Sequence, residues 1–283
     1  MKLVPTLTRS TLALLMAAMI AGLAGAAQAQ GKLEAHYTAT LAGVPIGKGS
    51  WVIDIGDAHY TAAASGMTTG LVRMFTGGRA SGAAQGTLSG GQSVASNYSA
   101  TINTSHRADE IRLTVASGNV KDFHVDPPTE PDPRRIPVTD AQRQGVMDPM
   151  TASLVLMPGN GEMRVAQACD RNLAIFDGRL RYNLKLAFKR MENVVSEKGY
   201  SGPAVVCSVT FEPVAGFVPK RSAILYLSEP HDMEVWLVPI AGTRVMVPYR
   251  AQIETPVGTG VIAATQFVAA AAPNHVTKGA KTQ

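Results

Sequence analysis

The feature that most constrains this chain is a period-two alternation of apolar and polar residues that recurs along most of its length. The stretch LEAHYTATL shows it clearly, because Leu33, Ala35 and Tyr37 fall on one side and polar residues fall on the other. Such alternation is typical of a β-strand with one buried face. We therefore expect an all-β fold made of many short strands.

Further strand-like runs follow, separated by turns rich in Gly, Ser and Asn. They are SWVIDI, HYTAAAS, RASGAAQGTL, VASNYSATI, EIRLTVA and VKDFHV in the first half, and AVVCSVTFEPV, AILYLSE, MEVWLVPI, RVMVPYRAQIET and GVIAATQFVAA in the second. This short, regular spacing is typical of antiparallel sandwiches and barrels. The many glycines indicate bulges or bends in strongly curved strands. The sequence predicts one large curved antiparallel sheet that forms an open barrel or β-spiral.

The charged, aromatic stretch AIFDGRLRYNLKL (residues 174–186) has two interpretations, a reactive site or a hairpin. Asp177-Gly178 is a strong hairpin signal, since glycine adopts positive φ without steric cost. Alternation continues after the turn, with Leu180, Tyr182 and Leu184 on one face. We expect a hairpin leading into a long amphipathic strand.

Two stretches depart from the β pattern and are expected to form short helices that cover the sheet. Residues 66–75 (GMTTGLVRMF) have the composition for one or two helical turns. Residues 148–157 (DPMTASLVLM) begin with Asp148 as an N-cap and Pro149 at the first helical position, and Pro158 and Gly159 are expected to end this helix.

Residues 126–137 (DPPTEPDPRRIP) contain five prolines, and this composition predicts an extended connector rather than a central strand. We expect a single β-spiral or barrel-like domain over residues 30–272 with this connector inside it. The polar residues 273–283 are expected to form a flexible tail.

The N-terminus has the pattern of a secretory signal peptide over residues 1–29. Lys2 and Arg9 form a positive region, an apolar run from Thr11 to Ala27 follows, and Ala27-Gln28-Ala29 fits the small-x-small cleavage rule. A retained membrane anchor is the alternative, because the run approaches the ~20 residues that a spanning helix needs. We favour cleavage before Gln30, export to the periplasm and no transmembrane anchor afterwards.

The only cysteines, Cys169 and Cys207, both lie in the expected mature chain. Exported thiols usually pair, and their wide separation suits neither a C-x-x-C redox motif nor a zinc site. We expect a structural disulfide between them.

Charge and motifs exclude several classes of function. Loss of Lys2 and Arg9 with the signal lowers the net charge from +5 to +3, which is too small to favour nucleic-acid binding. Residues 43–50 (GVPIGKGS) lack the spacing of a phosphate loop and are expected to form a hairpin turn. Gly258-Thr259-Gly260 lacks the helix and acidic residue of a dinucleotide site.

No catalytic group, metal site or cofactor is predicted. The six histidines are scattered outside any H-E-x-x-H pattern, and no G-x-S-x-G elbow occurs. Paired carboxylates for glycoside cleavage stay open, because their proximity cannot be read from one sequence.

Several motifs, in order, resemble the exported bacterial DUF3108 family over about residues 33–268. They are AGVPIGKG, MTTGLVRMF, GVMDPMTASL, AIFDGRLRYNLKL, GPAVVCSVTFEPVAGF, and MEVWLVPI followed by TPVGTG. The resemblance implies an envelope location and no established activity. The chain is more distantly similar to a periplasmic envelope-integrity family with an incompletely closed β-spiral, which implies a role in envelope maintenance.

Three functional hypotheses follow. The favoured one is a non-catalytic envelope protein that supports envelope integrity by binding a lipid-like ligand or a partner protein; the others are a hydrolase acting on envelope components and a structural scaffold. A curved sheet encloses an interior that side chains either fill or line. The candidate cavity-lining residues are Trp51, Phe176, Tyr182, Phe188, Trp236 and Tyr249.

Overall fold

The computed structural model describes residues 30–70, 77–159, 163 and 165–271, and in this part of the chain all strands join one sheet. The strands are β1 (Gly31–Leu41), β2 (Val44–Ile55), β3 (His59–Thr68), β4 (Gly78–Ser89), β5 (Gln92–Thr104), β6 (Ala108–Ala116), β7 (Asn119–Asp126), β8 (Val155–Leu156), β9 (Arg171–Phe176), β10 (Arg181–Val195), β11 (Lys198–Gly199), β12 (Ser201–Ala215), β13 (Met233–Pro239), β14 (Val245–Ile253) and β15 (Gly260–Ala271). The helices are α3 (Pro149–Ala152) and α4 (Ser222–Ser228), with single 3₁₀ turns η2 (Asp140–Arg143) and η3 (Val165–Cys169).

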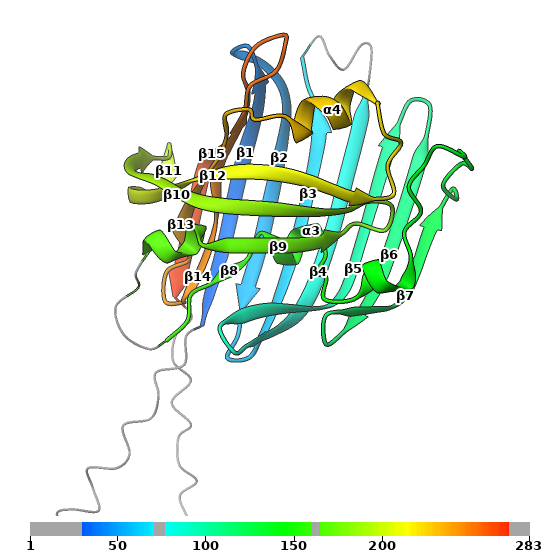
Figure 1. Cartoon of the computed structure of the whole chain (residues 1–283). Helices are drawn as coiled ribbons and strands as arrows, with labels where there is room; N and C mark the ends of the chain where they lie inside the picture. The colour runs from blue at the N-terminus through cyan, green and yellow to red at the C-terminus, as the bar shows by residue number, and fades with distance from the viewer. Residues whose placement is uncertain (1–29, 71–76, 160–162, 164, 272–283) are drawn as a thin grey trace, which may run out of the picture.

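The sheet is antiparallel and open. Its order is β7-β6-β5-β4-β3-β2-β1-β15-β14-β13-β12-β10-β9, with the short strands β8 and β11 pairing β14 and β15 from off this path. Only the two-residue pairing of β11 with β15 is parallel among these strand pairs. Figure 1 shows β9, β10 and β12 running across the long strands β1–β7, so the sheet curls over its own face. The prediction of an all-β open barrel with one or two short helices is confirmed, but of the two helices only α3 lies where the sequence predicted one.

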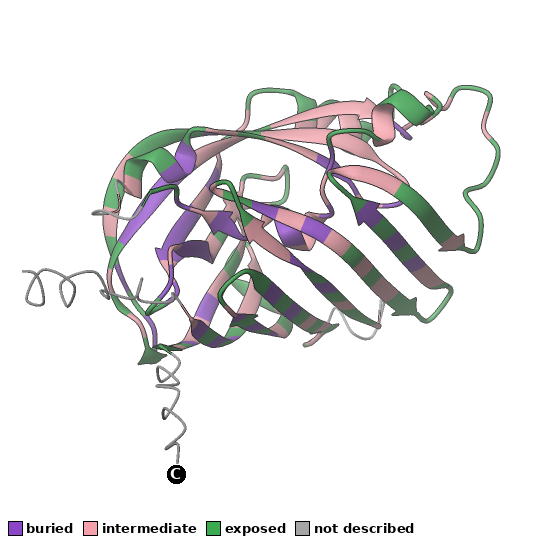
Figure 2. Ribbon diagram, turned by 90° about the horizontal axis from the view of Figure 1, so that it is seen from below, coloured by how far each residue is buried: buried purple, intermediate pink, exposed green. Residues whose placement is uncertain are grey.

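The alternation read from the sequence places one face of each strand inside the curl. Leu33 and Ala35 of β1 are fully buried, whereas their neighbours Glu34 and His36 are exposed. Figure 2 shows the same banding of buried and exposed residues along neighbouring strands. In the register of the sheet, Leu33 lies opposite Ile53 of β2, which in turn lies opposite Ala62 of β3.

The interior is filled by apolar side chains at the end of β1–β3 where β1 begins. Leu33, Ile53, Ile55 and Tyr60 are almost fully buried there and belong to the largest core cluster. A second cluster lies between η3 and strands β12–β14, and a third joins β5 and β6 to Phe176 of β9. The remaining interior space, at the other end of β1–β3, forms the candidate site described below.

The Asp177-Gly178 hairpin is confirmed, and it also closes the curl. The Asp177 carboxylate accepts hydrogen bonds from the backbone N–H groups of Arg179 and Leu180. Gly178 has φ +97°, and a Cβ there would lie 2.6 Å from Ile111 of β6, so only glycine allows this close approach. Arg179 donates to Asp109 of β6 at 2.7 Å. The stretch is therefore a structural hairpin whose tip holds the two ends of the sheet together.

The predicted helix after Asp148 forms, but it is shorter than expected. Asp148 is fully buried and caps α3 by accepting from the backbone N–H groups of Met150 and Thr151, each at 2.9 Å. Its other oxygen accepts from the Thr151 hydroxyl, which also bonds Tyr60 of β3. The helix ends at Ala152 rather than near Pro158, because residues 155–156 pair with β14 as β8.

Three local predictions need correction. The run AILYLSE is not a strand, because residues 222–228 form α4. The periodicity of so short an apolar run does not distinguish a strand from a helix. In the helix, the Tyr226 hydroxyl donates to the Glu254 carbonyl. Residues 66–68 of the first expected helix complete β3, where they pair with β2 and β4. Its residues 71–75 lie outside the described residues. The turn expected over residues 43–50 is confined to Ala42-Gly43, because β2 already begins at Val44.

The proline-rich stretch follows β7, which ends at Asp126. Residues 127–137 contain no strand, and the Asp126–Pro127 peptide bond is cis. Near the end of this stretch Ile136 exchanges backbone hydrogen bonds with Gly216 and Phe217, just after β12. The stretch therefore runs from one edge of the sheet to the strands that cross its face.

The predicted disulfide is confirmed. Cys169 at the end of η3 and Cys207 of β12 are joined, with their Cα atoms 5.3 Å apart, and both are fully buried. No helix in the described part of the chain is long and apolar enough to span a membrane. The expected signal segment, residues 1–29, and the expected tail lie outside the described residues.

Candidate functional site

Two connected chambers occupy the unfilled part of the interior. The first, of about 580 Å³, lies over β1–β3 beneath α3, and the second, of about 480 Å³, lies between β1 and strands β10, β12 and β13. Both are lined by the same five residues where they meet, namely Ala39, Ser153, Pro248, Ala251 and Ile262. We call the combined space the trough.

The floor of the first chamber exists because its inward positions carry almost no side chain. Moving along β1–β3 away from the filled core, the inward residues become Ala39, Gly47, Gly49, Ala64 and Gly66. At the filled end the corresponding positions hold Leu33, Ile53 and Tyr60. Protein interiors are normally close-packed, so a run of small residues opposite a covering helix leaves room for a ligand.

The walls of the second chamber are apolar side chains from several strands. Leu184 and Leu186 of β10 face Val209 of β12, and Val155 of β8 closes the side next to α3. The trough also opens to solvent, since Ile262, which lines both chambers, is 52% exposed. This arrangement suits a flexible apolar chain, because hydrophobic burial is favourable and has no directional requirement.

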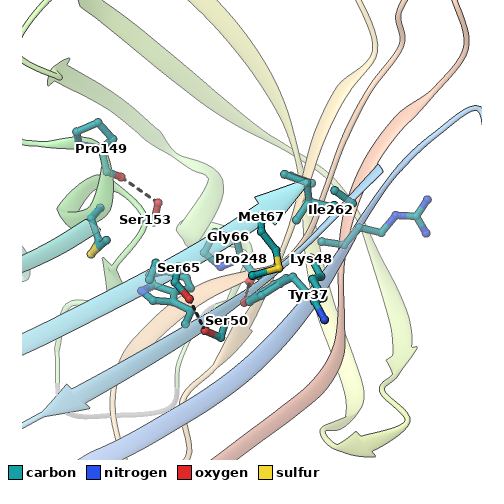
Figure 3. A pocket seen from close by; sticks show the side chains of 18 of the residues that line it. Tyr37, Lys48, Ser50, Ser65, Gly66, Met67, Pro149, Ser153, Pro248 and Ile262 are labelled. Carbon is teal, nitrogen blue, oxygen red and sulfur yellow. Dashed lines mark hydrogen bonds between the residues drawn. The ribbon is translucent and has the colours of Figure 1, made fainter. Parts of the chain in front are cut away.

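Most polar groups bordering the first chamber are already bonded within the protein. Tyr37 donates to the Pro248 carbonyl at 2.8 Å. Ser153 donates to the Pro149 carbonyl, and Ser50 is bonded to Ser65, as Figure 3 shows. Burial raises the pKa of Tyr37, so this phenol stays neutral. These groups shape the wall and leave a largely apolar surface.

The six residues expected to line a cavity occupy different places. Trp51 lines the first chamber and is 8% exposed. Phe176, Trp236 and Tyr249 lie in the core clusters, with Phe176 packed edge-on against Phe123. Tyr182 packs against Phe211, and Phe188 is 51% exposed on β10. The structure therefore brings only Trp51 of this set to the trough.

The trough-lining residues that sequence reasoning missed are mostly small. Gly47 and Gly49 are expected in a turn, and Gly66 is expected in a helix. In the sheet, Gly47 and Gly49 lie opposite the inward residues Ala39 and Tyr37 of β1, and Gly66 lies opposite Gly49, so all three positions face inward. Pairing each strand with its neighbour in register would have revealed a row of inward glycine and alanine. Tyr98 of β5 was missed because its strand was read without its partners.

An ion pair with a buried carboxylate borders the second chamber. Glu234 of β13 is 7% exposed and receives two hydrogen bonds from Arg190 of β10, at 2.8 and 3.1 Å. Lys189 lies 2.6 Å from the same carboxylate. The bonds from Arg190, followed by those from Lys189, hold the pKa of Glu234 at about 2, well below its usual 4.5.

Folding lowers the pKa of Glu234, so this group stabilises the fold above its unfolded pKa and loses that contribution as the pH falls toward 2. The wild-type protein should therefore lose stability between about pH 5 and pH 2. Glu234→Gln should be less stable at neutral pH and should show a flatter dependence over that interval. Urea unfolding at several pH values measures this, with Glu254→Gln, at an exposed carboxyl, as the control that keeps the wild-type slope.

Two other carboxyl groups have pKa values that burial raises, Asp148 and Asp177. Each accepts backbone hydrogen bonds, Asp148 at the α3 cap and Asp177 in the hairpin turn. Among the described residues, no group of three or more His, Cys, Asp or Glu side chains is placed to hold a metal ion.

The fold and the trough together define an all-β, open-barrel protein with an apolar interior space. The family described as "Protein of unknown function (DUF3108)" matches residues 36–265, and the chain belongs to this family. No curated protein matches the sequence.

Two solved structures are similar to this chain. A β-barrel-like protein of domain of unknown function DUF1849 from Brucella abortus aligns with a TM-score of 0.48 at 9% identity, over 86% of this chain and 98% of that one. A putative lipoprotein from Parabacteroides distasonis aligns with a TM-score of 0.30 at 9% identity, over 85% and 96% of the two chains.

Proposed function

We propose that this protein is an exported, periplasmic binding protein that holds an apolar, lipid-like chain in its trough. The observation that carries the proposal is the pair of connected chambers, about 580 and 480 Å³, lined mostly by apolar or small residues. Each volume lies in the range typical of small-molecule sites. The space lies inside the curl of the sheet, which favours a chain-like ligand over a partner protein.

The exported location is supported by two features. Residues 1–29 have the charge, apolar run and cleavage pattern of a signal peptide. The buried Cys169–Cys207 disulfide fits an oxidising compartment. A protein that sequesters lipid chains between the membranes would support envelope integrity by keeping such chains out of water.

The direct test uses the mature protein, residues 30–283, and the apolar fluorophore N-phenyl-1-naphthylamine. We expect its fluorescence to rise on binding and to fall when methyl laurate displaces it. Mass spectrometry of an organic extract of the purified protein should also recover lipid. Absence of both probe binding and bound lipid would overturn the proposal.

Filling the trough should abolish this binding. Ala251 lies at the junction of the chambers and is exposed, so Ala251→Trp places an indole in the shared space with little cost to folding. We expect the affinity for the fluorophore to fall at least about tenfold, because ligand and indole cannot share that volume. The matched control is Ala270→Trp. Ala270 is an exposed residue of β15 that lies opposite Lys32 of β1 on the outer face of the sheet, so this variant should bind the fluorophore as the wild type does.

A further inference from the structure

Three segments that are far apart in the sequence meet at one end of the molecule. The Ala42 N–H donates to the Thr259 carbonyl, so the turn between β1 and β2 lies against the turn between β14 and β15. The Tyr226 hydroxyl of α4 donates to the Glu254 carbonyl at 2.6 Å, which places α4 beside the second turn. Figure 1 shows both turns and α4 at this end. We call residues 42–45, 220–229 and 254–259 the rim.

The rim borders the opening of the trough. Four residues that adjoin the two turns, Thr40, Ile46, Ile253 and Gly260, line the second chamber. Ile262, which lines both chambers and is half exposed, lies two residues further along β15. The trough therefore reaches solvent beside the rim.

Each of the three rim segments exposes an apolar side chain. Val44 is 56% exposed, Leu225 of α4 is 49% exposed and Val257 is 69% exposed. None of the three lines either chamber, so a ligand in the trough leaves them in water. Single exposed apolar residues are ordinary on a protein surface, whereas several gathered beside a cavity are typical of an interaction surface.

Cations flank these apolar side chains on two sides. Lys220 and Arg221 directly precede α4 and are exposed. On the sheet, Lys48 of β2 and Arg79 of β4 lie in register on either side of Met67, which is partly exposed. In the described part of the chain, none of these four cations forms an ion pair.

The rim carries fewer anions than the cations around it. Its two carboxyl groups belong to Glu229 and Glu254, and Glu229 lies 3.9 Å from His231. Exposed apolar side chains beside an excess of cations complement anionic head groups that overlie an apolar layer. The apolar side chains stand on two turns and one short helix, so each can enter a fluid layer separately, whereas a protein partner needs a matched pocket for each.

We propose that the rim docks the protein on a membrane surface that contains anionic lipid, with Val44, Leu225 and Val257 inserted at the level of the head groups. In this orientation the opening of the trough faces the bilayer. The inference goes beyond the proposed function, because vesicle binding is measurable whether or not the trough holds a ligand.

The test measures co-sedimentation of the mature protein, residues 30–283, with vesicles of dioleoylphosphatidylcholine and dioleoylphosphatidylglycerol. Val257→Asp puts a negative charge at the most exposed of the three apolar positions, and it should weaken vesicle binding at least about tenfold. Lys220→Gln combined with Arg221→Gln should weaken it at least about fivefold. Added salt and vesicles of phosphatidylcholine alone should each weaken the binding of the wild type, because both reduce the electrostatic attraction.

Val195 supplies the matched control. It is 74% exposed and lies at the end of β10 near β11, which pairs with Gln266 and Phe267 of β15 rather than with the rim. Val195→Asp should bind the vesicles as the wild type does. As a second readout, Val257→Trp should add indole emission that lipids brominated on their acyl chains quench, and Val195→Trp should add emission that these lipids leave unchanged.

The outcomes separate this inference from the proposed function. Absence of wild-type binding to the anionic vesicles, or equal binding of Val257→Asp and Val195→Asp, overturns the docking inference. A wild-type dimer that Val257→Asp dissociates, without vesicle binding, overturns it too and makes the rim an interface between copies. Val257→Asp should keep the wild-type affinity for N-phenyl-1-naphthylamine in solution, because Val257 does not line the trough. A wild type that binds vesicles but neither the fluorophore nor lipid contradicts the proposed function alone.

Discussion

Removing the disulfide, as the double variant Cys169→Ala with Cys207→Ala, will lower the free energy of unfolding by about 4 kcal/mol. The bond closes a loop across a sequence separation of 38 residues, which contains β9, β10, β11 and the first half of β12. Without the bond, the unfolded chain gains conformational entropy in that loop, which favours unfolding. For a chain of this size, the expected fall in Tm is roughly 8–16 °C.

Comparison of the oxidised and reduced wild-type protein isolates the bond itself, because their atoms otherwise differ only by two hydrogens. Both cysteines are fully buried, so reduction should require denaturant or heat rather than a reductant alone. The double alanine variant adds the loss of two sulfur atoms from the core cluster around Val205 and Leu237. A reduced protein that unfolds within about 2 °C of the oxidised one would contradict this prediction.

Asp148→Ala will have the second largest effect, a loss of about 3 kcal/mol. The variant removes the α3 cap and leaves the backbone N–H groups of Met150 and Thr151 without their acceptor in a fully buried place. It also removes the acceptor of the Thr151 hydroxyl, which connects α3 to Tyr60 on β3. The expected fall in Tm is roughly 6–12 °C, measured by thermal unfolding.

Asp148→Asn is the informative companion variant. Its amide oxygen can still accept from both backbone N–H groups, and the Thr151 hydroxyl can turn to donate to Tyr60. We therefore expect Asp148→Asn to retain most of the stability. Asp140→Ala, at the exposed carboxylate of η2, should change stability by less than about 0.5 kcal/mol. Equal losses in Asp148→Ala and Asp148→Asn would show that the negative charge, rather than the cap, is what matters.

Sequence reasoning succeeded where a local pattern has one structural solution. The alternation around Leu33 predicts β1, Asp177-Gly178 predicts the hairpin, and Asp148-Pro149 predicts the start of α3. Each depends on the geometry of a few neighbouring residues. The run that became α4 has no such signature, since a short apolar segment fits either a buried strand or a helix.

The trough is harder to predict because it depends on distant partners. Gly49 and Gly66 form a floor only because they lie opposite each other in register, with Tyr37 on the next strand. Aromatic residues are equally able to fill a core, and Trp236 and Tyr249 do so. Whether a side chain fills or lines an interior depends on which end of its strand is covered, and one sequence does not contain that information.

The edges β7 and β9 are the two ends of the sheet, and no backbone ladder joins them in the described part of the chain. Arg179 with Asp109, the Phe123–Phe176 contact, and the segment Val146–Met147, which bonds to Gly118 on one side and to Ala174 on the other, hold this seam closed. Under the proposed function, we expect a bulkier ligand to be accommodated by separation of β7 from β9, which breaks these few contacts and leaves every strand pairing intact. A closed barrel, in which backbone hydrogen bonds join every strand to the next, would instead have a fixed circumference.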